Sequence, residues 1–170
     1  MSHENSPPTR EAMVDAIGRA RVEGFIVHRG TPRTLLLDLD TEAAKAQFHR
    51  VFETLAQMYD VTGVSMWASK SGNLHVRVGV KAAMSVTTRL ALQASMGSDG
   101  IREILAHYRH VYEGVDEPSL LFRPPTSVVY PYRPGNLCHK CFKKTPADVM
   151  GDDGLCPTCA FLQMPDEVSA

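Results

Sequence analysis

Long apolar runs are absent from this sequence of 170 residues. No stretch approaches the roughly 20 consecutive apolar residues that a membrane-spanning helix requires. The opening segment, MSHENSPPTR, also lacks the apolar core of a secretory signal peptide. We therefore expect a soluble, cytoplasmic protein. The chain is long enough for one sizeable hydrophobic core and a small appendage.

A large excess of charge of either sign is missing as well. The formal net charge is -1, which excludes a uniformly basic surface of the kind that binds nucleic acid non-specifically. Any contact with nucleic acid must then come from a local cluster of basic side chains. The sequence also shows no internal repeat and no low-complexity segment.

Cysteine is absent from most of the chain and is confined to two CxxC pairs near its end, CHKC and CPTC. The four residues are Cys138, Cys141, Cys156 and Cys159. Without a secretion signal, two such pairs indicate a closed, structural Cys₄ zinc site rather than disulfides. A pair of redox-active CxxC motifs is the alternative. The lysines around the pairs suit contact with nucleic acid, while docking to another protein remains open.

The periodicity of apolar residues predicts a mixture of helices and strands. In chain order we expect a helix over 10–22, a strand over 25–28, a strand over 34–40, a helix from about 41 to 59, a strand over 63–69, a strand over 74–80, helices from about 86 and from about 101, and a strand over 119–122. This order predicts an α+β fold, in which helices cover one face of a small, mostly antiparallel sheet. The other face would be open and would carry the chemistry.

The same patterns predict the domain organisation. We expect a disordered tail over 1–9, a main domain over 10–123, a proline-rich linker over 124–136, a zinc ribbon over 137–161 and a mobile tail over 162–170.

One strand ends in two aspartates, in the stretch LLLDLD that closes with Asp38 and Asp40. Residues two apart share a face of a strand, so the two carboxylates project side by side. A divalent cation would relieve their repulsion, and hard oxygen ligands suit Mg²⁺ or Mn²⁺. In the alternative interpretation, Asp40 is the N-cap of the next helix and Asp38 is a solvated charge.

A polar turn and strand, KSGNLHVRV, follow further along. Gly72 allows close approach of a ligand to the backbone, and Lys70 supplies a positive charge for phosphate. Strand parity predicts that four polar side chains share the face away from the core: Ser71, Asn73, His75 and Arg77. If this face also bears Asp38 and Asp40, a metal pair lies beside a phosphate-binding cluster.

Taken together, LLLDLD and SGNLH resemble the first two motifs of the archaeo-eukaryotic primase superfamily, the primase-polymerases. The hallmarks of that family are an hhhDxD strand and an SxH strand. The segment RLALQASMGSDGIREIL is also similar to the helices that follow in small phage-encoded members. The resemblance covers about residues 25–123. It implies an RRM-like catalytic core and a DNA primase or polymerase, a nucleotidyltransferase, that acts on a single-stranded DNA template with NTP or dNTP.

The resemblance also implies residue roles. Asp38 and Asp40 would hold the catalytic Mg²⁺ or Mn²⁺ ions, which activate the attacking 3′-hydroxyl and stabilise the departing pyrophosphate. His75 would contact the triphosphate, and Ser71, with Lys70 and Arg77, would hold phosphates by charge-assisted hydrogen bonds. The chain carries no helicase motif, and the sequence leaves open whether a helicase or another replication protein acts with it in trans.

One departure from the family pattern keeps an alternative open. The family has a third carboxylate at the end of a later strand, but Arg123 stands there in this chain. Asp99, Asp116 and Glu117 are the candidates to replace it. The alternative is a degenerate primase fold that binds nucleotide or nucleic acid without catalysis. A haloacid-dehalogenase-type phosphatase is a third interpretation, disfavoured because Glu42 stands where that family has Thr or Val.

Overall fold

In the computed structural model, residues 9–131 are described, so the sequence predictions for the zinc ribbon and the two tails lie outside this range. Internal contacts divide the chain into Met1–Tyr130 and Pro131–Ala170, and the fold below is that of the first unit. The described elements follow one another as α1 (Arg10–Val22), β1 (Ile26–Arg29), β2 (Thr34–Leu39), α2 (Glu42–Met58), β3 (Val61–Ala68), β4 (Leu74–Val80), α3 (Val86–Ser95), α4 (Gly100–Glu113), β5 (Leu120–Arg123) and β6 (Tyr130–Pro131). These elements form the predicted α+β fold, with antiparallel sheets and four helices in the described part of the chain.

The main sheet has the strand order β2-β4-β3-β6, and a separate two-stranded ribbon joins β1 to β5. The pairs β2–β4, β3–β4 and β1–β5 are all antiparallel. In the β2–β4 register Asp38 pairs with His75, and in the β3–β4 register Trp67 also pairs with His75. The two sequence motifs therefore lie on neighbouring strands.

Polar side chains fix the starts of the helices by accepting hydrogen bonds from free backbone N–H groups. Thr41 is the N-cap of α2, and its hydroxyl accepts from Ala44 N at 3.1 Å. The interpretation of Asp40 as this N-cap is therefore wrong. Asp99 is the N-cap of α4, and its carboxylate accepts from Ile101 N at 3.0 Å.

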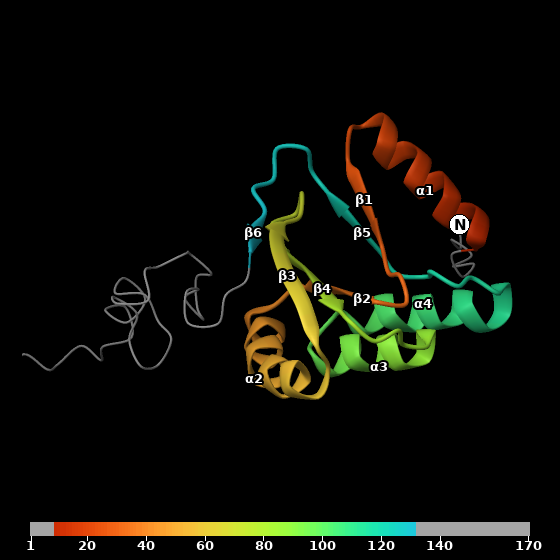
Figure 1. Cartoon of the computed structure of the whole chain (residues 1–170). Helices are drawn as coiled ribbons and strands as arrows, with labels where there is room; N and C mark the ends of the chain where they lie inside the picture. The colour runs from red at the N-terminus through yellow and green to blue at the C-terminus, as the bar shows by residue number, and fades with distance from the viewer. Residues whose placement is uncertain (1–8, 132–170) are drawn as a thin grey trace, which may run out of the picture. The chain divides into compact units, whose positions relative to one another are not determined.

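The core lies on both faces of β2. Leu35, Leu37 and Leu39 on one face are inaccessible to solvent, and so is Leu36 on the other. The helices α2 and α3 lie on one side of the main sheet, with the β1–β5 ribbon and α1 on the other (Figure 1). Leu121 of β5 packs in a buried cluster with Leu36 and Trp67.

The second face of the sheet is thus only partly open, which differs from the sequence prediction. His75 was expected to point away from the core, but only 7% of its surface is exposed. Arg77, two residues further on the same face, is exposed. The short strands β1 and β5 pair with each other and cover the His75 end of the face. The alternating pattern of β4 could not reveal this cover, because it comes from segments distant in the sequence.

Candidate functional site

Asp38 and His75 form the centre of the candidate site. His75 Nε2 lies 3.3 Å from Asp38 Oδ1, an ion pair when the imidazole is protonated. Burial alone would raise the pKa of Asp38. The interaction with His75, together with Asp40 and the charge of Arg102, outweighs burial, and the pKa lies below its ordinary value. Asp38 is therefore held as a carboxylate.

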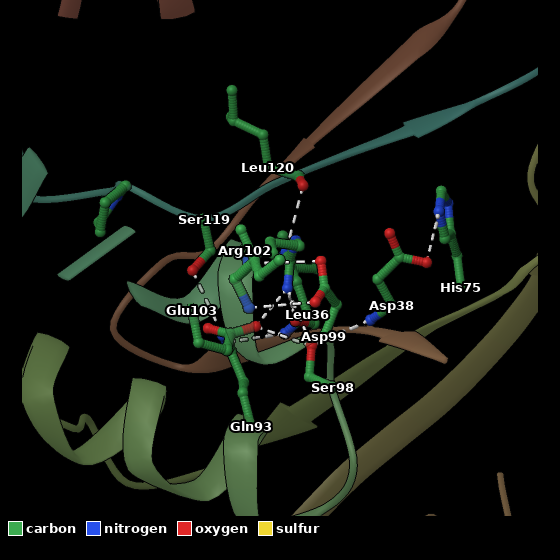
Figure 2. Close-up of polar contacts among 12 residues, drawn as sticks. Leu36, Asp38, His75, Gln93, Ser98, Asp99, Arg102, Glu103, Ser119 and Leu120 are labelled. Atoms are coloured by element: carbon green, nitrogen blue, oxygen red, sulfur yellow. Dashed lines mark hydrogen bonds and ion pairs between the residues drawn. The ribbon is translucent and has the colours of Figure 1, made fainter. Parts of the chain in front are cut away.

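The backbone of Asp38 is anchored on the side opposite β4, because β2 is an edge strand of the main sheet. Asp38 N donates to Ser98 Oγ at 3.1 Å, and Asp99 N donates to Asp38 O at 3.0 Å. Figure 2 shows these contacts together with the carboxylate of Asp38 directed toward His75. The loop between α3 and α4 thus satisfies the strand edge and fixes the position of the carboxylate.

Beside this loop lies a buried polar network that the sequence did not reveal. Arg102 Nη1 donates to Leu36 O at 2.8 Å and to Glu103 Oε1 at 2.5 Å. Gln93 Nε2 donates to Glu103 Oε2 at 2.6 Å, and its Oε1 accepts from Leu36 N at 3.0 Å (Figure 2). Burial raises the pKa of Glu103, while Arg102 and the hydrogen bonds oppose that rise. Helical spacing in the sequence predicted α3 and α4, which carry these polar residues, but it did not reveal a network around β2.

Asp40 lies just beyond β2 and is exposed. Its Oδ1 accepts from Asn73 Nδ2 at 3.0 Å, which links the two motifs a second time. Burial and the neighbouring carboxylate of Asp38 raise the pKa of Asp40 to about 6. The two carboxylates therefore have surplus negative charge, which a divalent cation would neutralise, so this donor set fits the expected Mg²⁺ or Mn²⁺.

The turn between β3 and β4 borders a cleft of about 510 Å³ next to Asp38 and His75. Ser69 and Ser71 share a hydrogen bond of 2.9 Å between their hydroxyls, and Asn73 N donates to Ser69 Oγ at 3.0 Å. Gly72 adopts φ 89°, a conformation that favours glycine. Residues from α1, the segment between α1 and β1, β5 and this turn line the cleft together with the central pair: Ala16, Arg19, Ala20, Glu23, Phe25, Asp38, Ser69, Lys70, Ser71, Asn73, His75 and Phe122.

The predicted phosphate-binding residues divide between two places. Lys70 and Ser71 line the cleft, and the ammonium of Lys70 lies 3.8 Å from Glu23 with its side chain 80% exposed. Arg77 does not line this cleft; it borders a different groove at the other end of β4. The structure therefore groups Lys70, Ser71 and His75 with Asp38 and separates Arg77 from them.

A third metal-binding carboxylate is not found within residues 9–131. No group of three or more His, Cys, Asp or Glu residues in this range is arranged to share an ion. Asp99 lies close enough to contribute to the raised pKa of Asp40, but its own carboxylate accepts from Ile101 N at 3.0 Å. Asp116 and Glu117 border a separate pocket beside α1. None of the three candidates completes the site in this conformation.

Arg123 belongs to a cluster that sequence reasoning missed. It is near His28 of β1, whose pKa is lowered by burial and by the charges of Arg123, Arg77 and His75. The His28 ring lies 4.6 Å from the ring of Trp67, centroid to centroid. A histidine in a four-residue strand gives no sequence signal for such packing, because the contact depends on how the ribbon lies on the sheet.

The four cysteines of the predicted zinc site lie outside the described residues. Within residues 9–131, none of the helices combines the length and apolar character that crossing a membrane requires. We compared the chain with family models, curated proteins and solved structures, and none of the three comparisons gave a match.

Proposed function

We propose that this chain is a metal-dependent nucleotidyltransferase of the primase-polymerase type, which extends a nucleic-acid chain on a single-stranded DNA template. The observation that carries the proposal is the meeting of the two motifs: Asp38 and His75 are paired on adjacent strands and border one cleft with Ser71. A resemblance in sequence alone does not require this proximity.

The residues of the cleft have two roles in binding a nucleoside triphosphate. Lys70, the hydroxyl of Ser71 and His75 bind the phosphates by charge and hydrogen bonds. Asp38 and Asp40 hold Mg²⁺ or Mn²⁺, which supplies activation of the attacking hydroxyl and stabilisation of the leaving pyrophosphate. His75 also orients Asp38 through their 3.3 Å contact.

The remaining parts of the proposal come from the sequence. The α+β core would be the RRM-like core of a primase-polymerase, and residues 137–161 would form a Cys₄ zinc ribbon. The protein would act in the cytoplasm, with a helicase or another replication protein supplied in trans.

A second candidate function is a nucleotide- or nucleic-acid-binding module without catalysis. It is favoured by Arg123 at the end of β5, where the family pattern requires an acid. The lack of a third suitably placed ligand in the range 9–131 supports the same candidate. The loss of one carboxylate from a two-metal cluster would weaken the binding of at least one ion.

Template-dependent incorporation of labelled NTPs and dNTPs separates the two functions. The reaction would use single-stranded DNA with Mg²⁺ or Mn²⁺, and would compare the wild type with Asp38→Asn, His75→Asn and a matched control, Asp15→Asn, on an exposed site of α1. Products from the wild type and the control, absent from the other two, establish the enzyme.

Binding of labelled nucleotide to the same four proteins tests the second candidate function, the binding module without catalysis. Binding without products, lost in Asp38→Asn and His75→Asn, establishes the binding module. If neither products nor binding depend on these two residues, the site is not a nucleotide site.

A further inference from the structure

A second groove, of about 490 Å³, lies at the end of the main sheet away from the Asp38–His75 pair. It is bordered by basic, hydroxyl and glycine residues: Thr31, Arg33, Thr34, Thr62, Gly63, Arg77, Gly79, Val80 and Lys81. No carboxylate belongs to this lining. In a chain of net charge -1, three cations around one groove are a local concentration of positive charge.

The charges of the groove are available to a ligand. Arg33 and Arg77 are exposed, and within residues 9–131 neither guanidinium forms an ion pair. The ammonium of Lys81 lies 3.6 Å from the carboxylate of Asp60, with the two side chains 76% and 77% exposed. Such an exposed pair is weak and exchanges readily for a stronger anion.

The floor of the groove brings backbone close to the surface. A register shift between Val61 and Gly63 interrupts the pairing of β3 with β4, as in a β-bulge. Open space lies where a Cβ on Gly63 would point, whereas a Cβ on Gly79 would come within 2.7 Å of Thr62 Oγ1. Gly63 is exposed and leaves backbone open in the floor, whereas Gly79 is buried and the hydroxyl of Thr62 lies over it.

We infer that this groove binds the phosphate backbone of a single nucleic-acid strand, an inference that rests on the proposed function for the identity of the ligand. Cations with hydroxyl groups, and no aromatic side chain, suit phosphate contacts without recognition of bases. Arg77 and His75 are successive residues on one face of β4, about 7 Å apart along the strand. The β1–β5 ribbon covers the His75 end of this face, so the groove and the cleft at Asp38 are separate openings of the surface.

The inference is tested by measuring how tightly a fluorescein-labelled oligothymidylate binds to the full-length, zinc-loaded chain. The measurement is made without added nucleotide or Mg²⁺, over a range of salt concentrations. The variant Arg33→Ser/Arg77→Ser/Lys81→Ser removes the groove cations. The matched control Arg10→Ser/Arg21→Ser/Arg50→Ser removes three exposed arginines elsewhere and changes the net charge equally.

The groove variant should bind at least tenfold more weakly, and its salt slope should be smaller by about 2, since each lost phosphate contact removes about 0.7 from the slope for single strands. The control should stay within twofold of the wild type. Equal weakening in both variants, or none in either, overturns the inference. If polyglutamate competes for the groove as effectively as unlabelled oligothymidylate does, the inference is also overturned. The groove would then bind an acidic protein.

The same proteins separate this inference from the proposed function. Asp38→Asn should bind the oligothymidylate like the wild type while it fails to incorporate nucleotide. If the wild type incorporates no nucleotide but the groove variant still loses binding, the groove assignment stands and the enzyme proposal fails. If the wild type is active and the groove variant binds normally, the groove assignment alone fails.

Discussion

Ser98 holds Asp38 from the side of β2 that faces away from His75: Asp38 N donates to Ser98 Oγ at 3.1 Å. Ser98 is 5% exposed, and its hydroxyl donates in turn to Glu103 Oε1 at 2.7 Å. The position of the candidate metal ligand therefore depends on a buried network that contains no ligand itself.

Gly97 allows the loop that carries Ser98 to pass close to α2. Its φ is 90°, and a Cβ there would lie 2.6 Å from Ala44 O. Gly97→Ala should therefore destabilise the protein by about 2 kcal/mol or more, through backbone strain and the clash. Gly18→Ala on α1 is the control, because nothing lies within 4 Å of its Cβ; it should stabilise by roughly 0.5–1 kcal/mol. Urea unfolding measures the free energy of unfolding of both variants. An equal change in Gly97→Ala and Gly18→Ala would contradict the loop geometry.

Arg102 neutralises the buried carboxylate of Glu103 at 2.5 Å. Arg102→Met should cost about 3–5 kcal/mol of the free energy of unfolding, because it leaves a buried charge without its cation. The pKa of Glu103, already raised by burial, should rise further, so the variant should regain stability as the pH falls. Adding Glu103→Gln should recover part of the loss and remove this pH dependence. Urea midpoints at several pH values compare the single variants with the double variant. If the changes in the free energy of unfolding are additive, the two residues act independently.

Asp40 should make stability depend on pH near neutrality. Its pKa is raised from 3.8 to about 6 by burial and by Asp38, so its stabilising contribution is complete below about pH 4 and is lost as the pH rises through 6. Asp40→Asn keeps the acceptor for Asn73 but cannot ionise. Without divalent metal, the variant should match the wild type near pH 4 and exceed it in stability at pH 7. Urea midpoints across this range provide the test, and parallel curves would contradict the raised pKa.

Mg²⁺ should compete with the proton on Asp40. Because the ion binds the carboxylate form, its affinity for the wild type should fall about tenfold for each pH unit below 6. Titration calorimetry at pH 5, 6 and 7 measures this dependence, with Asp15→Asn as a control that should behave like the wild type. Affinity independent of pH would show that Mg²⁺ does not bind at Asp40.

The four cysteines should bind one zinc ion per chain. Release of zinc from purified protein by a thiol-blocking reagent, followed with a colorimetric chelator, measures the stoichiometry. Cys138→Ser combined with Cys156→Ser should abolish zinc binding, since each substitution removes a ligand from one CxxC pair. A disulfide-linked protein without zinc would contradict the predicted site.

Local patterns in the sequence determined most of the secondary structure. The helix α1 and the strand β4 have the predicted bounds, because apolar spacing and neighbouring turn residues act within a few positions of the chain. The sequence also singled out Asp38 and His75 as separate candidate site residues, since a strand that ends in two like charges and a polar turn before a histidine are both local features.

Only the tertiary structure decided how these elements meet. It placed Asp38 opposite His75, separated Arg77 from the cleft, and covered His75 with the β1–β5 ribbon. It also surrounded the edge of β2 with Gln93, Ser98 and Arg102, three polar residues on or beside amphipathic helices. Strand pairing and burial join positions far apart in the chain, and no local pattern records which distant segment satisfies a free strand edge.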